Sequence, residues 1–309
     1  GNCKNYLGGA PANVACGLSK LGVHTEFVGC LGDDEFGKEF INLFRDLGVN
    51  IQSTQVDKNC STRIIKVCIN DEGDRSFAGF VNSQKIFADE MLDRKVFERS
   101  EISLQTLFKE AKYFITGTNL LASNKSSEAL LFLVEYASKS GVSIVIDANW
   151  REIFWDKFDK SSQIQKQDHI QKIKKFLLNG DILKLSNEEA ILFFGNNNPL
   201  LISQSLSKKP DVIITNGDKP ISWFINGFQD TTKVLKSSRI VDTTGAGDSF
   251  LAGLISRFIN RKEDFDKDSL INHIQFASVC GLISCLGEGA IQPQPNVNQV
   301  QDFLKLYGS

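Results

Sequence analysis

Residues 242–250, with the sequence DTTGAGDSF, combine the residue types that phosphoryl chemistry requires. Glycines at Gly245 and Gly247 flank Ala246, so the backbone can turn tightly and bring consecutive amide N–H groups into one concavity. A helix-spaced apolar pattern over 246–259 begins within this turn, and a helix N-terminus attracts phosphate. We therefore expect these three residues to hold the transferred phosphate.

Asp248 follows this turn directly, where its carboxylate would repel a bound phosphate unless it had a function there. We interpret Asp248 as a general base that removes the proton from a hydroxyl attacking the γ-phosphoryl group. The alternative is that Asp248 only favours the helix dipole, which would be the better interpretation of an isolated G-x-G-D. The complete nine-residue string favours the base.

Motifs for several other chemistries are missing. The sequence has no G-x-x-x-x-G-K-[ST] string, and Phe250 stands where a dinucleotide-binding turn would need a third small residue. The three histidines, His24, His169 and His273, show no zinc-ligand spacing. A P-loop, a dinucleotide site and a zinc site are not expected.

The composition is that of an ordinary globular protein. Hydrophobic residues make up 41% and charged residues 23% of the 309 residues, with a net charge of -2, so we expect no nucleic-acid partner. The seven cysteines form no C-x-x-C pair, which is typical of reduced thiols in the cytoplasm. No apolar run approaches the roughly 18 residues needed to span a bilayer, and no membrane partner is expected.

The elements that must position these residues follow an α/β pattern. Strand-like apolar runs occur at 26–31, 113–116, 143–147, 181–185 and 211–215, with a further strand-like segment at 239–241. Helical spacing occurs at 12–21, 36–47, 127–138, 170–178, 246–259 and 271–285. This alternation predicts a largely parallel sheet with helices on both faces, which would bind ligands at the carboxyl ends of its strands.

The segment 53–80 has a different pattern. Residues 63–69 and 75–81 surround a turn at 70–73 and read as a β-hairpin without a helix. Such a hairpin can close over an active site and exclude water, or it can be an ordinary edge hairpin.

Two motifs resemble those of the ribokinase-like carbohydrate kinases of the phosphofructokinase B type, and most closely its fructokinase branch. The string at 242–250 matches the family's D-T-T-G-A-G-D-S-F, and 8–15 fits its G-G-x-x-x-N-x-A turn. The resemblance implies a single kinase domain over 1–309, an α/β fold with a three-layer α/β/α sandwich, a mostly parallel central sheet and a small β lid at about 53–81. Family members begin with a strand that leads to a sugar-binding aspartate, so we expect such a segment before Gly1.

The resemblance assigns the sugar site to several motifs. Gly8, Gly9 and Asn13 would meet sugar hydroxyls together with Asp248, although Gly8 and Gly9 could equally form a tight turn alone. The DANWR segment at 147–151 looks like the D-x-N-x-R element of fructokinases.

That element would bring Asn149 and Arg151 to sugar or phosphate oxygens. Arg63 lies in a lid-like segment and would also contact the substrate, and Phe77 and Phe80 would cover the sugar or a partner subunit. Simple packing of these two phenylalanines remains an alternative.

The resemblance also assigns nucleotide contacts, to Ser186, Thr215, Gly217, Gly245, Gly247 and Gly287. Pro220 replaces the last glycine of the T-x-G-x-x-G motif, which puts the shape of that loop in doubt.

Two cation sites follow from the resemblance. Glu189 would hold Mg²⁺ through water, with Ser186 replacing the usual asparagine of N-x-x-E, while a surface-charge role of Glu188 and Glu189 stays open. Asp242 and Thr244 lie where relatives bind K⁺.

The implied activity is ATP- and Mg²⁺-dependent phosphorylation of the primary hydroxyl of a free sugar, with D-fructose giving fructose 6-phosphate. Other substrates stay open: 2-keto-3-deoxygluconate, ribose or a nucleoside. A non-catalytic scaffold that binds sugar or nucleotide is an alternative from another class. The expected partners are the sugar, ATP and a second copy of the chain, bound through the lid.

Overall fold

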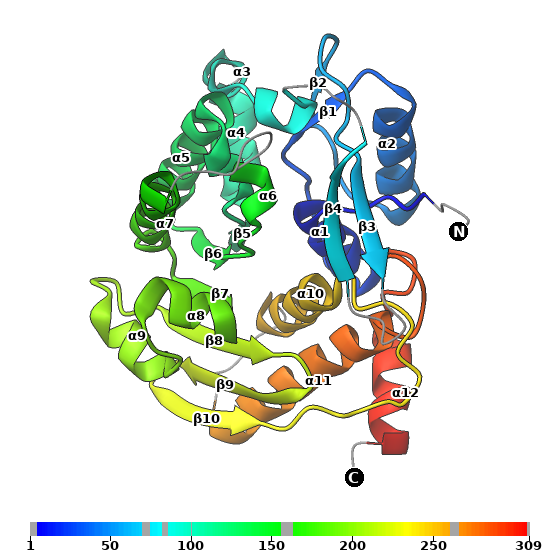
Figure 1. Cartoon of the computed structure of the whole chain (residues 1–309), viewed down its shortest axis with the longest axis vertical. Helices are drawn as coiled ribbons and strands as arrows, with labels where there is room; N and C mark the ends of the chain where they lie inside the picture. The colour runs from blue at the N-terminus through cyan, green and yellow to red at the C-terminus, as the bar shows by residue number, and fades with distance from the viewer. Residues whose placement is uncertain are drawn as a thin grey trace. The chain divides into compact units, whose positions relative to one another are not determined.

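The computed structural model describes residues 5–69, 75–81, 86–99, 101–155, 163–259 and 266–307. The chain divides into two compact units, and Figure 1 labels its helices and strands. The first comprises Gly1–Ser83 and Thr232–Ser309, and the second comprises Gln84–Thr231. The single kinase domain expected over 1–309 stays a prediction.

The second unit is built on a six-stranded sheet with the order β10-β9-β8-β7-β6-β5. Its strands are β5 (Tyr113–Thr116), β6 (Ser143–Asp147), β7 (Ile182–Ser186), β8 (Asp211–Asn216), β9 (Lys219–Ile225) and β10 (Phe228–Thr232). Neighbours from β5 to β8 are parallel, and β9 is antiparallel to β8. Apolar runs such as Ile144 to Ile146 are fully buried, as a parallel sheet covered by helices requires. The four strands predicted here are confirmed to within one residue at each end.

Helices pack on this sheet. Among them, α5 (Asn124–Lys139) contacts β6, and α8 (Asn187–Phe194) contacts β7 and β8. The remaining helices of the unit are η1 (Ala88–Met91), α3 (Arg94–Arg99), α4 (Glu101–Lys109), η2 (Asn119–Ala122), α6 (Glu152–Trp155), α7 (Gln163–Leu177) and α9 (Pro199–Ser205). The helix predicted from residue 170 thus begins earlier, at Gln163.

The first unit is mainly helical. Its helices are α1 (Ala10–Lys20), α2 (Glu35–Leu47), α10 (Ala246–Ile259), α11 (Lys267–Ser284) and α12 (Val297–Tyr307). The apolar helix α10 packs against α1 and α11, and ten of its 14 residues are buried. Its bounds are those predicted from the sequence.

Short strands complete this unit. β1 (Cys30–Gly32) pairs in parallel with β2 (Gln55–Asp57), and β3 (Ile65–Ile69) pairs antiparallel with β4 (Arg75–Phe80). The predicted hairpin is thereby confirmed, whereas its turn at 70–73 and the Phe77 side chain lie outside the described residues. Its function as a lid stays a prediction.

Of the two other strands predicted in the first unit, one is found only in part and the other is wrong. The run 26–31 forms a strand only from Cys30, and Glu26 makes an isolated bridge with Asn50. Residues 239–241, all of them described, form no strand. The amides of Val241 and Asp242 instead donate to the carbonyl of Cys285 at the end of α11.

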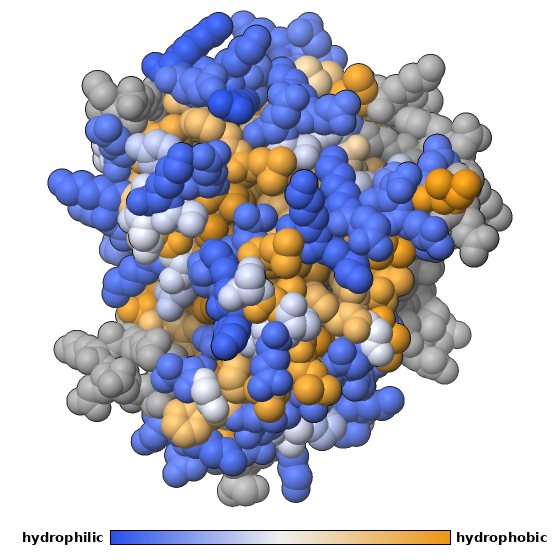
Figure 2. Space-filling view, turned by 90° about the vertical axis from the view of Figure 1, so that its left-hand side faces the viewer, coloured by the Kyte–Doolittle hydropathy of each residue, from blue (hydrophilic) through white to orange (hydrophobic). Residues whose placement is uncertain are grey.

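No helix within the described ranges combines the length and apolarity needed to cross a bilayer. Hydrophobic and hydrophilic residues are interspersed on the face drawn in Figure 2.

Candidate active site

The turn before α10 has the geometry expected of an anion cradle. Gly245 has a φ of 79°, which side-chain-bearing residues rarely adopt. The Ser249 amide donates to the Gly245 carbonyl over 2.8 Å, and the Ala246 amide donates to Thr243. The Gly247 amide has no acceptor in the part of the chain that the structure describes. An open N–H at the start of a 14-residue helix suits a phosphate oxygen.

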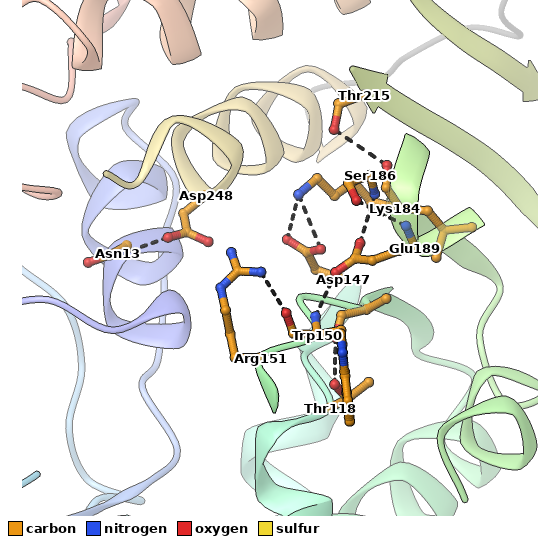
Figure 3. Close-up of polar contacts among 12 residues, drawn as sticks. Asn13, Thr118, Asp147, Trp150, Arg151, Lys184, Ser186, Glu189, Thr215 and Asp248 are labelled. Atoms are coloured by element: carbon orange, nitrogen blue, oxygen red, sulfur yellow. Dashed lines mark hydrogen bonds and ion pairs between the residues drawn. The ribbon is translucent and has the colours of Figure 1, made fainter. Parts of the chain in front are cut away.

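Asp248 lies beside Asn13, although 235 residues separate them in sequence. The Nδ2 atom of Asn13 donates to Oδ2 of Asp248 over 2.7 Å, and both side chains are buried (Figure 3). The Oδ1 atom of Asn13 is buried without a protein partner, and a Cβ on Gly8 would lie 3.6 Å from it. A buried acceptor without a donor fits a hydroxyl-bearing ligand. The structure therefore brings together Gly8, Asn13 and Asp248, and their contact with a sugar stays a prediction.

Gly9 precedes α1 as its N-cap, with a φ of 125°. The tight-turn interpretation therefore describes its backbone correctly, and sugar contact by Gly8 and Gly9 stays a prediction.

Asp242 joins the anion turn to the loop after α11. Its Oδ1 accepts the Thr244 amide over 2.8 Å, and its Oδ2 accepts the Gly289 amide over 3.0 Å. In the same loop, a Cβ on Gly287 would lie 2.8 Å from Pro293. The described residues contain no group of three or more His, Cys, Asp or Glu side chains that could hold a metal ion. The potassium site therefore stays a prediction.

Substitution of Gly245 tests how tightly this turn is packed. An added Cβ would lie 2.8 Å from the Ala290 Cβ and 3.0 Å from its carbonyl oxygen. We expect Gly245→Ala to lower the free energy of unfolding by about 2 to 3 kcal/mol, from backbone strain and overpacking together. Gly22 has the same φ of 79° with nothing within 4 Å, so Gly22→Ala should cost only about 1 kcal/mol. Equal urea midpoints for the two variants would contradict close packing at Ala290.

In the second unit, Glu189 is buried and uses both carboxylate oxygens. Oε2 accepts the Ser186 amide over 2.7 Å, completing a capping box at the start of α8. Oε1 accepts the Trp150 amide over 2.6 Å (Figure 3). The surface-charge interpretation is therefore wrong for Glu189, while it holds for the exposed Glu188. Glu189 holds the loop that follows β6.

Lys184 was missed by sequence reasoning. Its Nζ donates to Oδ1 and Oδ2 of Asp147 over 3.2 and 2.9 Å, and both side chains are buried. The parallel register of β6 and β7 sets the two residues side by side. Burial, followed by the charge of Asp147, raises the pKa of Glu189, and the charge of Lys184 opposes this shift. A lysine inside the apolar run ILKL was the available signal, because a buried lysine requires a partner.

These contacts fix the loop that carries Asn149 and Arg151. Asn149 has a φ of 40° and is buried. The hydroxyl of Thr118, also missed from the sequence, donates to the Ala148 carbonyl over 2.5 Å. Nη1 of Arg151 donates to the Trp150 carbonyl over 2.7 Å. The loop is thus held on several sides.

The T-x-G-x-x-G-like segment is a tight β8–β9 hairpin. Asn216 pairs with Lys219, and Gly217 has a φ of 57° in the turn. Pro220 lies within β9, so it continues the strand rather than a wide loop. The Thr215 hydroxyl donates to the Leu185 carbonyl over 3.4 Å.

Arg63 lies just before the β3–β4 hairpin. Its guanidinium carbon is 5.2 Å from the centre of the Phe80 ring, a cation–π contact. Phe80 therefore packs on Arg63, and contact of either residue with sugar stays a prediction.

Comparisons with known proteins find relatives that are named fructokinases. Relatives include probable fructokinase-5 of Arabidopsis thaliana, 31% identical over 302 residues that cover 96% of this chain and 88% of the relative. Fructokinase-2 of Zea mays is 31% identical over 301 residues, covering 96% and 84% of the two chains.

Solved structures share the fold. Fructokinase with bound ATP from Xylella fastidiosa has a TM-score of 0.83 at 23% identity, covering 97% of this chain and 90% of that one. A Vibrio cholerae O395 fructokinase with fructose, ADP and calcium has a TM-score of 0.81 at 24% identity, covering 98% and 94%. The expected ribokinase-like α/β fold with its mostly parallel sheet is confirmed. The model of the pfkB family carbohydrate kinases matches residues 1–297, and the chain belongs to this family.

Proposed function

We propose that the chain transfers the γ-phosphoryl group of ATP to the primary hydroxyl of D-fructose, giving fructose 6-phosphate. The contact between Asn13 and Asp248 beside the open amide of Gly247 carries this proposal. It sets a carboxylate and a hydroxyl-binding amide next to a phosphate-binding turn. Relatives named fructokinase, and a related fructokinase structure that contains fructose and ADP, support the choice of substrate.

Each group has a separate task in the transfer. Asp248 accepts the proton of the sugar hydroxyl as that oxygen attacks phosphorus. Asn13 orients a sugar hydroxyl through its Oδ1, and the open amide of Gly247 offsets charge that develops on the phosphate oxygens. The guanidinium group of Arg151 would donate to sugar or phosphate oxygens.

The cations complete the proposal. Mg²⁺ would neutralise charge on the phosphates of bound ATP. Glu189 would hold Mg²⁺ through water, because each of its oxygens already accepts a backbone amide. K⁺ would bind near Asp242 and Thr244. The nucleotide contacts expected of Ser186, Thr215, Gly217 and Gly287 belong to the same proposal.

A coupled assay of sugar-dependent ADP release tests the substrate. We expect the highest kcat/KM with fructose in a panel that includes 2-keto-3-deoxygluconate, ribose and a nucleoside. One hydroxyl group that the site is built to bind can discriminate strongly between such substrates. A higher kcat/KM for another member would replace fructose as the substrate, and ATP binding without sugar-dependent ADP release would favour the scaffold.

Two further expectations stay predictions. A dimer through the lid would cover the exposed apolar side chains of Val56 and Val81. The cytoplasmic location rests on cysteine usage, and one relative, 30% identical, is named a chloroplastic probable fructokinase-6.

A further inference from the structure

Lys20, the last residue of α1, makes an unusual set of contacts with the loop after α11. Its ammonium group donates to the backbone carbonyls of Ile291, Gln292 and Gln294 over 2.6, 3.0 and 3.2 Å. An ammonium group has three hydrogens to donate, so these bonds use its full capacity. Burial lowers the pKa of Lys20, as expected for an ammonium group partly removed from water.

The loop that Lys20 binds also contacts the phosphate-binding turn. Ala290 lies against Gly245, within 3.0 Å of where a Cβ on this glycine would lie. The Gly289 amide donates to Asp242, whose other carboxylate oxygen accepts the Thr244 amide of the turn. The position of this loop therefore limits the position of the turn.

The side chain of Gln294 also connects the loop to α1 by hydrogen bonds. Nε2 of Gln294 donates to the Ala290 carbonyl over 2.8 Å and to the Asn13 carbonyl over 3.1 Å. Helix α1 thus contacts the loop through Lys20 at its C-terminal end and through Asn13 near its start. Asn13 also donates to Asp248. The same loop therefore contacts both α1, which carries Asn13, and the Gly245 turn that is proposed to bind phosphate.

We propose that Lys20 is a positioning residue for phosphoryl transfer, acting as a built-in cation that holds residues 289–294 against the Gly245 turn. The proposal rests on the kinase function proposed above. Three carbonyl dipoles that converge on one point repel each other without a positive charge or a donor between them. Loss of the ammonium group should therefore let the loop relax and loosen the turn, while Asn13 and Asp248 keep their own hydrogen bond.

Lys20→Met tests this inference, because it keeps an apolar stem of similar length and removes the charge and the three donors. We expect kcat/KM for ATP to fall about 10-fold, a change equivalent to roughly 1.4 kcal/mol, with the KM for fructose little changed. Ammonium ions should restore at least half of the lost kcat/KM, because they fit among three carbonyl oxygens. Tetramethylammonium at equal ionic strength should not, since it is too large and has no N–H donor. The wild type in the same salts gives the baseline.

Two further variants complete the test. Lys38 of the same unit is exposed and makes one ion pair, with Asp33, so Lys38→Met should behave as the wild type. Lys20→Arg keeps the charge and several donors and should stay within about threefold of the wild type. An Arg variant as impaired as the Met variant, or a folded Met variant that ammonium does not restore, would overturn the proposal.

Hydrogen–deuterium exchange separates this inference from the proposed function. Amides of the 287–294 peptide should exchange faster in Lys20→Met and slow again when ammonium is added. If the wild-type chain phosphorylates no sugar, the proposed function is refuted. The exchange rates still show whether Lys20 holds the loop, because they do not depend on activity. Unchanged exchange in the Met variant would overturn the proposed role of Lys20 whatever the activity.

Discussion

Asp248→Asn is expected to reduce the turnover of sugar-dependent ADP release by at least about 100-fold, because positioned general bases contribute about 10²- to 10⁴-fold. The substitution keeps the shape of the side chain. An oxygen at position 248 can still accept the hydrogen bond from Nδ2 of Asn13, which measures 2.7 Å in the wild type. Only the basicity and the negative charge are removed, so the affinity for ATP, measured by titration without sugar, should change little.

Two control variants separate the base from its surroundings. Asn13→Ala keeps the carboxylate and removes its neighbour, so the KM for fructose should rise more than turnover falls. Asp266 is an exposed carboxylate that caps α11 in the same unit. Asp266→Asn should leave turnover unchanged, because asparagine is an equally good N-cap. Near-normal turnover in Asp248→Asn, or a sugar complex with this carboxylate turned away from the acceptor oxygen, would refute the assignment.

The sequence predicts an element well where several local signals agree. Residues 246–259 combine a glycine turn with sustained helical spacing of apolar residues, and α10 has these bounds. The strands at 113–116 and 143–147 are also found as predicted, because both runs are too short for a helix and are rich in β-branched or aromatic side chains.

Where local signals conflict, sequence reasoning fails. β9 was missed because it contains Pro220, which cannot donate a ladder hydrogen bond. The structure accommodates it beside a register irregularity between Ile214 and Asn216. β10 was missed because its sequence, FQDTT, is mostly polar.

The site itself depends on contacts that spacing cannot reveal. The family resemblance named Asn13 and Asp248, but their hydrogen bond exists only because α1 packs against α10. Lys184 meets Asp147 only because β6 and β7 are adjacent in one register. Motifs in the sequence thus named candidate residues, and packing decided which of their groups touch.

Lys184→Met is expected to lower the free energy of unfolding by about 3 to 5 kcal/mol, because it leaves the carboxylate of Asp147 buried without its partner. Both side chains of the pair are less than a tenth exposed, so water cannot replace the ammonium group. The urea midpoint at pH 7 measures the effect. The double variant Asp147→Asn/Lys184→Met should recover most of the loss, because it also removes the buried charge.

Lys208 provides the matched control in the same unit. Its Nζ lies 2.9 Å from Asp181 Oδ1, the same distance as the shorter contact of the buried pair, but both side chains are more than a third exposed. Lys208→Met should therefore cost at most about 1 kcal/mol. Similar losses for the two lysine variants would show that burial does not strengthen the pair.

The pH dependence of stability tests whether the loss of unfolding free energy in Lys184→Met has an electrostatic origin. Lys184 opposes the burial and the Asp147 charge that raise the pKa of Glu189, so its removal should raise that pKa further. The folded variant then binds a proton at a pH at which the unfolded chain has released it. A group with such a raised pKa makes stability rise as pH falls. The difference in unfolding free energy between the wild type and Lys184→Met should therefore shrink as the pH is lowered from 7 to the ordinary glutamate pKa of 4.5. A deficit that stays constant over this range would mean that the charge of Lys184 does not lower the pKa of Glu189, and would contradict electrostatic coupling among Asp147, Lys184 and Glu189.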